Sequence, residues 1–194
     1  MKRLIFLITF ALLFLRCTAP ELTPTLRNNQ AEIAQLNRLI VIQDILIQES
    51  KKQFEKFISK LQFVESSGNW KAINKLGCIG LFQFAPGTLK DLGHAEITTE
   101  AFKNNPDIFP PSMQVKVLNE LIKANEKGLK NCFAYIGKVV NGVLITKAGL
   151  IAGAHLGGVG GVTTFLESGG QTNRKDVNNA TVQGYMKMFA EYNI

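Results

Sequence analysis

The chain has 194 residues, of which 46% are hydrophobic and 19% are charged. This length indicates one domain of ordinary size, and this apolar fraction excludes a disordered chain. The formal net charge is +7, but three of the 22 Lys and Arg residues lie in the first 17 positions, which contain no acid. The remaining 19 basic residues stand against 15 acidic ones and form no basic stripe. The composition therefore argues against nucleic acid as a partner and suits an anionic polymer.

The N-terminus has the pattern of a targeting segment. A positively charged start precedes the apolar run Leu4–Leu15, which is shorter than the roughly 20 residues that span a bilayer. This pattern predicts a secretory signal over residues 1–17. Cys17 resembles the lipidated cysteine of a bacterial lipoprotein signal, although Arg16 stands where such signals carry a small residue; cleavage after Ala19 is the alternative. We expect an exported protein of the cell envelope, either periplasmic or anchored to the outer membrane as a lipoprotein.

A long helical pattern follows a Pro- and Thr-rich linker, Thr18–Thr25. From about Asn28 to Phe63 there is no Pro or Gly, and apolar residues recur on and around one face. This pattern predicts one long helix or two abutting ones, which either form a self-associating stalk or pack on the domain. We therefore divide the chain into the signal segment, a linker and N-terminal helix at 18–50, and a domain at 51–194.

The rest of the chain is predicted to be mainly helical, with at most one short β-hairpin. Glycines and Asn74 between Gly68 and Pro86 favour irregular backbone and place the hairpin there. Further helices are expected at Pro86 to Gly93, Met113 to Lys127, Cys132 to Val140 and Lys147 to Leu156. Ser112 is expected to cap the second of these and Thr146 the fourth, which Gly157–Gly161 should end. A last helix is expected after Asn178–Thr181, with Val182, Tyr185, Met186 and Phe189 facing inward. The helix after Thr146 is rich in Ala and Gly, so we expect it to be central and close to its neighbours.

Cysteine and histidine placement indicates no metal site and no cofactor. Cys78 and Cys132 either pair after export or remain free thiols, because nothing in the sequence fixes their distance. His94 and His155 are far apart and have no neighbouring Cys or acid cluster. His155, at the end of the small-residue helix, is either a structural histidine or an acid–base group.

One carboxylic acid, Glu65, belongs to the most informative stretch, Phe63–Thr88. Apolar and aromatic neighbours are typical of a site that keeps a glutamic acid protonated near neutral pH, although a solvated acid at a helix end has the same position. Ser66 is placed to hydrogen-bond its carboxylate. Gln83, which follows Phe82, either offers an amide to a sugar or faces solvent.

A second carboxylate is missing close to this acid. There is no Asp or Glu from Ser66 to Lys90, whereas glycoside hydrolysis generally uses two carboxylates about 5–9.5 Å apart. A partner acid would have to come from elsewhere, such as Asp91, Glu96 or Asp107. Without one, the substrate must supply its own nucleophile.

These residues carry a family resemblance. Glu65-Ser66, then Gly80-Leu81-Phe82-Gln83-Phe84, then Pro86-x-Thr88 resemble the lytic transglycosylase family of the lysozyme superfamily, which reads Glu-Ser, Gly-Leu-Met-Gln and Pro-x-Thr. A later family element, Ala-Tyr-Asn-Ala-Gly, loosely resembles Ala152–Gly158, with His155 near the family's Tyr. The resemblance covers about Phe54 to Phe189 and implies a lysozyme-like helical catalytic domain.

The resemblance also implies roles for individual residues. Glu65 would protonate the glycosidic oxygen between N-acetylmuramic acid (MurNAc) and N-acetylglucosamine (GlcNAc), then act as a base so that a 1,6-anhydroMurNAc end forms. Ser66 would steady Glu65, Gln83 and the backbone around Phe82 would bind sugar, and His155 would lie over Glu65 in place of the tyrosine. The expected partners are peptidoglycan glycan strands and, through a lipid on Cys17, the membrane.

Other functions remain open on the sequence alone. A hydrolytic, lysozyme-type muramidase is one, because the His at position 155 departs from the family pattern. A non-catalytic protein that binds or assembles cell wall on the same fold is another, as is a membrane-anchored structural protein if the signal is not cleaved.

Overall fold

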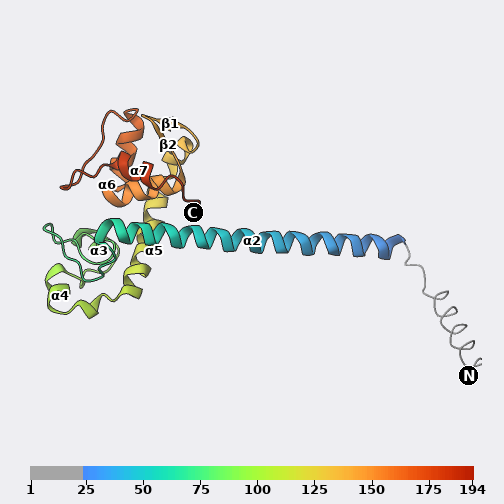
Figure 1. Cartoon of the computed structure of the whole chain (residues 1–194), viewed down its shortest axis with the longest axis horizontal. Helices are drawn as coiled ribbons and strands as arrows, with labels where there is room; N and C mark the ends of the chain where they lie inside the picture. Colours follow the sequence, from blue (N-terminus) through green and yellow to red (C-terminus); the bar gives the residue numbers. More distant parts are fainter. Residues whose placement is uncertain (1–23) are drawn as a thin grey trace, which may run out of the picture. The chain divides into compact units, whose positions relative to one another are not determined.

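The computed structural model of the chain describes residues 24–194 (Figure 1). The predicted signal segment, Cys17 and most of the predicted linker lie outside the described residues. The chain divides into a unit that ends at Ile47 and a globular unit, Gln48–Ile194. Its elements are α2 (Pro24–Ser66), α3 (Pro86–Asp91), α4 (Thr99–Asn104), the 3-10 helix η1 (Pro106–Ile108), α5 (Pro111–Gly128), the 3-10 helix η2 (Lys130–Tyr135), β1 (Val139–Val140), β2 (Val143–Leu144), α6 (Lys147–Glu167) and α7 (Val182–Met188). The prediction of a mainly helical fold with one short hairpin is confirmed.

The long helix α2 is a single element. Pro24 is its first residue, a position where proline fits because the first N–H groups of a helix have no partner within it. No Pro or Gly interrupts the chain until Gly68. There the backbone turns left-handed, with φ of 53° at Ser67 and 77° at Gly68. The helix therefore starts and ends a few residues outside the predicted Asn28–Phe63, and it carries Glu65 in its last turn.

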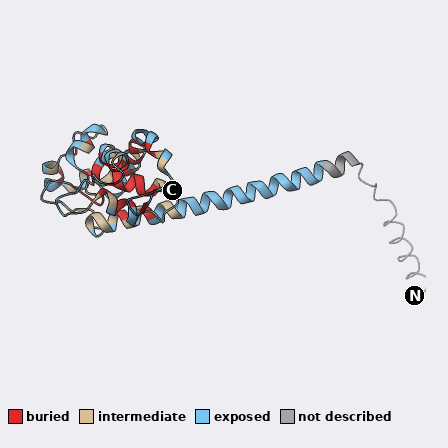
Figure 2. Ribbon diagram, turned by 90° about the horizontal axis from the view of Figure 1, so that it is seen from above, coloured by how far each residue is buried: buried red, intermediate tan, exposed pale blue. Residues whose placement is uncertain are grey.

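Residues 29–47 of α2 are exposed to solvent (Figure 2). Nine large apolar side chains in this part are between 42% and 64% exposed: Ile33, Leu36, Leu39, Ile40, Val41, Ile42, Ile45, Leu46 and Ile47. A surface with this much apolar area is uncommon unless another molecule covers it.

The core of the globular unit is aromatic. Phe57 and Leu61, on the last turns of α2, are buried together with aromatic side chains from the loop before α3, from α4, from the end of η1 and from the chain after α7: Phe82, Phe84, Phe102, Phe109 and Phe189. The ring of Phe57 meets that of Phe189 edge-on, with centroids 5.1 Å apart. This packing fixes the C-terminal end of α2, and with it Glu65, against the rest of the unit.

Helix α6 is central, as its small residues predicted. Gly149 and Gly153 are buried against α7, and a Cβ atom on Gly149 would lie 2.8 Å from the carbonyl oxygen of Met186. The glycines therefore allow α7 to approach closely and bring Tyr185 toward the interior. The backbone leaves the helical conformation at Gly158 (φ 70°, ψ 169°), and helix resumes after it.

Three local predictions were wrong. Cys132–Val140 is not one helix: the 3-10 helix η2 ends at Tyr135, Gly137 follows with φ of 85°, and Val139–Val140 form strand β1. The hairpin lies at Val139–Leu144, where Asn141 and Gly142 both have positive φ, as the two-residue turn of a hairpin requires; the stretch Gly68–Pro86 has only isolated bridges. Ser112 is not a helix cap, because α5 begins one residue earlier with Pro111 in its first turn.

One helix of the described residues, α6, is long and apolar enough to cross a membrane by length and composition alone. Most of that apolar window, 61%, is buried within the protein, so it has the burial expected of a core helix.

Candidate active site

A cleft of about 440 Å³ in the globular unit contains the candidate acid. Its walls come from the end of α2, the loop before α3, the end of the first half of α6, and the chain on either side of the start of α7. The lining side chains include Glu65, Asn74, Leu76, Cys78, Gln83, Thr88, His155, Asp176, Val177, Asn178, Tyr185 and Met188. Three residues predicted to form the site, Glu65, Gln83 and His155, therefore lie on one cleft.

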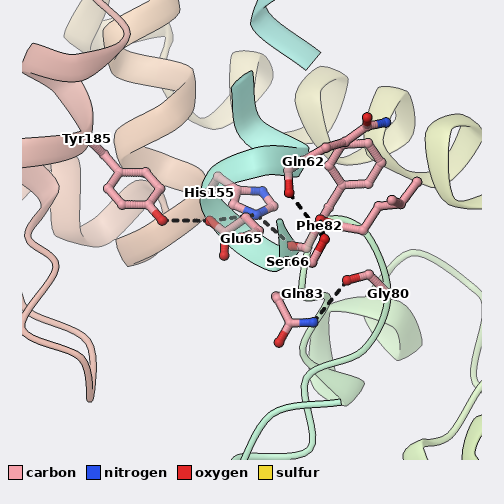
Figure 3. Close-up of polar contacts among 9 residues, drawn as sticks. Gln62, Glu65, Ser66, Gly80, Phe82, Gln83, His155 and Tyr185 are labelled. Atoms are coloured by element: carbon pink, nitrogen blue, oxygen red, sulfur yellow. Dashed lines mark hydrogen bonds and ion pairs between the residues drawn. The ribbon is translucent and has the colours of Figure 1, made fainter. Parts of the chain in front are cut away.

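Glu65 is held at this cleft by a tyrosine. Its side chain is 14% exposed, and the hydroxyl of Tyr185 donates a hydrogen bond to Oε1 over 2.8 Å (Figure 3). The contact joins the last turn of α2 to α7, 120 residues later in the chain. Because Oε1 accepts from Tyr185, Oε2 is the oxygen left to carry the proton of the acid.

Tyr185 is a permanent donor in this arrangement. Burial is the largest cause that raises the pKa of its hydroxyl far above the ordinary value, and the negative charge of Glu65, the hydrogen bond to it and the charge of Asp176 act in the same direction. The phenol therefore keeps its proton at physiological pH.

His155 approaches the same carboxyl oxygen from α6. Its Nε2 lies 2.9 Å from the carbonyl oxygen of Phe82 and 3.6 Å from Glu65 Oε1 (Figure 3). Only 9% of the His155 side chain is exposed. The histidine thus contacts both the candidate acid and the loop that forms the neighbouring wall.

That loop, Gly80–Phe84, is fixed by three helices. Ser66 Oγ on α2 donates to the carbonyl of Leu81 over 2.9 Å, and the buried Gln114 on α5 accepts from the Leu81 N–H over 2.6 Å. His155 on α6 binds the next carbonyl, that of Phe82. The hydroxyl of Ser66 is therefore directed at the loop and has no hydrogen bond to Glu65.

Two loop residues predicted to contact sugar differ in position. Phe82 is fully buried, and its side chain belongs to the core, so its backbone alone takes part in the site. Gln83 lines the cleft with φ of 48°, and its Nε2 donates to the carbonyl of Gly80 over 2.9 Å. This bond orients the amide and leaves its oxygen as an acceptor.

A second carboxylate lines the cleft, and it is not one of the three acids that the sequence offered. Asp91, Glu96 and Asp107 are exposed and do not line the cleft. Asp176 does line it, but Oδ1 accepts hydrogen bonds from the N–H groups of Asn178 and Ala180, at 2.9 and 2.8 Å. The carboxyl therefore shapes the turn before α7.

Cys78 and Cys132, the cysteines among residues 24–194, are free thiols, so the predicted alternative of a disulfide between them is wrong. Cys132 is buried, and Cys78 lines the cleft. Burial raises the pKa of the Cys78 thiol, an effect opposed by its hydrogen bond with Asn74 and added to by the charge of Glu65. Within residues 24–194, no group of three His, Cys, Asp or Glu side chains is arranged to hold a metal ion.

The site contains a carboxyl group with one oxygen free of hydrogen bonds, the Tyr185 hydroxyl and the His155 ring beside it, and a cleft wall of amides and apolar side chains. This set suits general acid–base chemistry on a hydroxyl-rich polymer. Among protein families, residues 45–144 match the transglycosylase SLT domain. No curated protein and no solved structure matches the chain. The match contains Glu65 and the loop Gly80–Phe84, and it ends before His155 and Tyr185.

Proposed function

The chain belongs to the transglycosylase SLT family, and from this premise we propose that it cleaves the β-1,4 bond between MurNAc and GlcNAc with Glu65 as the only acid and base. The family supports peptidoglycan lytic transglycosylase activity in general. One observation supports Glu65 as the only acid and base: its carboxyl group lies on a cleft, with one oxygen bound to Tyr185 and the other free of hydrogen bonds.

In the first step, Oε2 of Glu65 donates its proton to the glycosidic oxygen. The bond between that oxygen and C1 of MurNAc breaks, its electron pair stays with the GlcNAc hydroxyl, and positive charge develops on the muramoyl ring. Tyr185 stabilises the carboxylate that forms on Glu65, because a charged acceptor strengthens its hydrogen bond.

In the second step, the Glu65 carboxylate takes the proton from the muramoyl C6 hydroxyl. The C6 oxygen attacks C1 and closes the 1,6-anhydro ring, which restores the protonated acid. No water is consumed, so no second carboxylate has to activate one. Asp176, the other carboxylate that lines the cleft, uses Oδ1 to hold a turn, which supports this route over hydrolysis.

Sugar binding in the proposal uses the wall around the loop Gly80–Phe84. The amide oxygen of Gln83 accepts from a sugar hydroxyl, and Asn74 and Asn178 offer further amides from opposite sides of the cleft. Leu76 and Val177, 59% and 64% exposed, supply apolar surface for the ring faces.

Hydrolysis by a lysozyme-type muramidase is the second candidate, and Asp176 is the observation that favours it. If its free oxygen activates water, cleavage gives reducing ends, and Asp176→Asn abolishes them. Its use of Oδ1 in a turn makes us rank this reaction below ring closure.

The test is a mass-spectrometric digest of peptidoglycan by residues 18–194 with a parallel Glu65→Gln variant. We expect wild-type products that end in 1,6-anhydroMurNAc and a loss of several orders of magnitude in rate for the variant. Reducing ends would establish the hydrolase. Binding to sacculi without cleavage would establish a wall-binding or assembly protein.

Export, a lipid on Cys17 and self-association through α2 complete the proposal. The charged and apolar N-terminal segment supports the first two, and the exposed apolar side chains of residues 33–47 support the third. The mass of the protein recovered from the envelope tests the lipid: with Cys17 intact it should exceed the peptide mass by the acyl groups, and with Cys17→Ala it should not.

A further inference from the structure

His155 is the most enclosed ionisable side chain of the cleft that the proposed reaction leaves without a task. It lies at the end of the first half of α6, three residues before the break at Gly158. Phe84 meets the imidazole ring edge-on at 6.5 Å between centroids. The ring therefore has a fixed position between the loop Gly80–Phe84 and Glu65.

The contacts of the ring assign its tautomer. The carbonyl of Phe82 can only accept a hydrogen bond, so Nε2, 2.9 Å away, must carry the hydrogen. Nδ1 is buried and has no hydrogen-bond partner in the described structure. In the neutral ring Nδ1 is a bare acceptor, whereas in the cationic ring it would be a charged donor buried without an acceptor, which costs more.

The same Nε2–H lies within 3.6 Å of Glu65 Oε1, the oxygen that also accepts from Tyr185. An imidazolium at this distance would favour the ionised form of Glu65. An ionised Glu65 has no proton to give to the glycosidic oxygen. The neutral ring, in contrast, supplies a donor without adding charge.

On the basis of the proposed reaction, we propose that His155 is a positioning residue that acts only in its neutral form. Its Nε2–H donates a hydrogen bond to the carbonyl of Phe82 and lies beside Glu65. It thereby holds the sugar-binding loop next to the catalytic acid. Protonation of the ring opposes catalysis because it places a cation beside Glu65 and an unpaired N–H at Nδ1. We therefore expect the site to be less active with a cationic His155 ring than with a neutral one.

Four other titratable groups line the cleft that the ring faces. Glu65 comes from α2 and Tyr185 from α7, and Cys78 and Asp176 lie on the same cleft. No Lys or Arg is among the residues that line it. The pKa values of Tyr185 and Cys78 are raised, so both groups stay protonated at and below neutral pH. The neighbour whose charge changes during catalysis is Glu65.

The experiment measures the cleavage rate from about pH 5 to pH 8, the range in which histidine titrates, for wild type, His155→Gln and His155→Phe. Glutamine keeps an N–H donor near the Nε2 position and does not titrate, so it should stay within about tenfold of wild type at neutral pH and lose the acid-side decrease. Phenylalanine fills the space without a donor and should lose roughly 10²-fold in kcat, with a smaller change in KM.

His94→Gln is the matched control. His94 is the chain's other histidine, its Nε2 lies 2.8 Å from Glu120 Oε2, and it does not line the cleft. This variant should keep the wild-type pH profile. The inference is overturned if His155→Gln retains the acid-side decrease, or if His155→Phe is as active as His155→Gln.

A measurement on the ring itself separates this inference from the proposed reaction. Nitrogen NMR of the two imidazoles, assigned with the His94→Gln variant, should find His155 with hydrogen on Nε2 and uncharged at neutral pH. Hydrogen on Nδ1, or a cationic ring at neutral pH, would overturn the inference whether or not the protein cleaves peptidoglycan. Absence of cleavage with the expected tautomer would overturn the proposed reaction alone.

Discussion

At the scale of single residues, the hydroxyl of Tyr185 is the group on which we expect Glu65 to depend most. It makes the one hydrogen bond that the structure gives to this carboxyl. A hydrogen bond to a charged group contributes about 1.5–3 kcal/mol, which corresponds to about tenfold to hundredfold in rate if it is made in the transition state.

We therefore expect Tyr185→Phe to lower kcat by about tenfold to hundredfold with little change in KM, because the lost bond serves the acid rather than the sugar. Tyr192→Phe is the matched control: Tyr192 packs on Phe189, as Tyr185 does, but does not line the cleft. Steady-state rates on peptidoglycan fragments measure both variants. Equal activity of Tyr185→Phe and wild type would remove Tyr185 from the mechanism.

The same residue predicts how stability depends on alkaline pH. Burial and the charge of Glu65 raise the pKa of Tyr185 in the folded protein, whereas an unfolded tyrosine ionises near about pH 10. Above that pH the unfolded chain loses a proton that the folded protein keeps, so the free energy of unfolding falls as pH rises. Below it, the contribution is fully present.

Urea unfolding at about pH 8 and about pH 11 measures this effect. Wild type should lose more stability between the two than Tyr185→Phe, while Tyr192, whose pKa is also raised, contributes equally to both proteins. The same loss in both proteins would contradict the assignment of a protonated, buried Tyr185.

The sequence revealed only one half of this site. Glu65, Gln83 and His155 were predicted through the family resemblance, because the residues alone left each of them open to a solvent-facing or structural position. Tyr185 was predicted to face inward, but as a core residue. It shares one face of its helix with the apolar side chains Val182, Met186 and Phe189. The available signal was its hydroxyl, because a buried tyrosine needs a hydrogen-bond partner. Which partner it finds, 120 residues away, depends on tertiary structure.

At the scale of elements, the approach of α7 to α6 decides where Tyr185 lies. The composition of α6 was sufficient to predict a central helix, because only small residues permit such close packing. The hairpin forms at Asn141-Gly142 because this pair adopts the positive φ angles of a two-residue turn, whereas the glycines before α3 lie in a loop with isolated bridges. Loop Gly80–Phe84 instead depends on distant partners such as Gln114, whose role no local pattern indicates.

Gly149→Ala should therefore disturb the site without touching it. The new Cβ would lie 2.8 Å from the backbone oxygen of Met186, next to Tyr185, and such overpacking typically costs about 1–3 kcal/mol. Gly160→Ala in the second half of α6 is the control, because no atom lies within 4 Å of its Cβ and alanine favours helix by up to about 1 kcal/mol.

Thermal unfolding and cleavage rate together test this expectation. Gly149→Ala should lower both the midpoint of unfolding and kcat, whereas Gly160→Ala should leave kcat unchanged and raise the midpoint or leave it as it is. A Gly149→Ala protein with unchanged stability and rate would show that α7 can move without consequence for Glu65.

At the scale of the whole molecule, the exposed apolar side chains of residues 33–47 of α2 indicate a surface that another molecule covers. Ile33, Leu36, Ile40 and Ile47 follow the spacing of a coiled-coil stripe, and Gln43 falls on the same stripe. Residues 29–47 contain only Glu32, Arg38 and Asp44 as charges, so copies of this segment do not repel one another strongly.

We expect the chain without residues 1–17 to self-associate through this part of α2. Full burial of one Ile or Leu side chain contributes about 1.5–3 kcal/mol, so a few of the nine exposed ones offset an association cost of about 4–15 kcal/mol.

Replacing Ile40 and Ile47 by Gln keeps helix propensity and should shift sedimentation equilibrium toward monomer, whereas Glu32→Gln should not. Cleavage of soluble fragments should be unaffected, since Glu65 and its partners all lie in the globular unit. A wild-type chain that stays monomeric at every concentration would leave the membrane or another protein as the molecule that covers this surface.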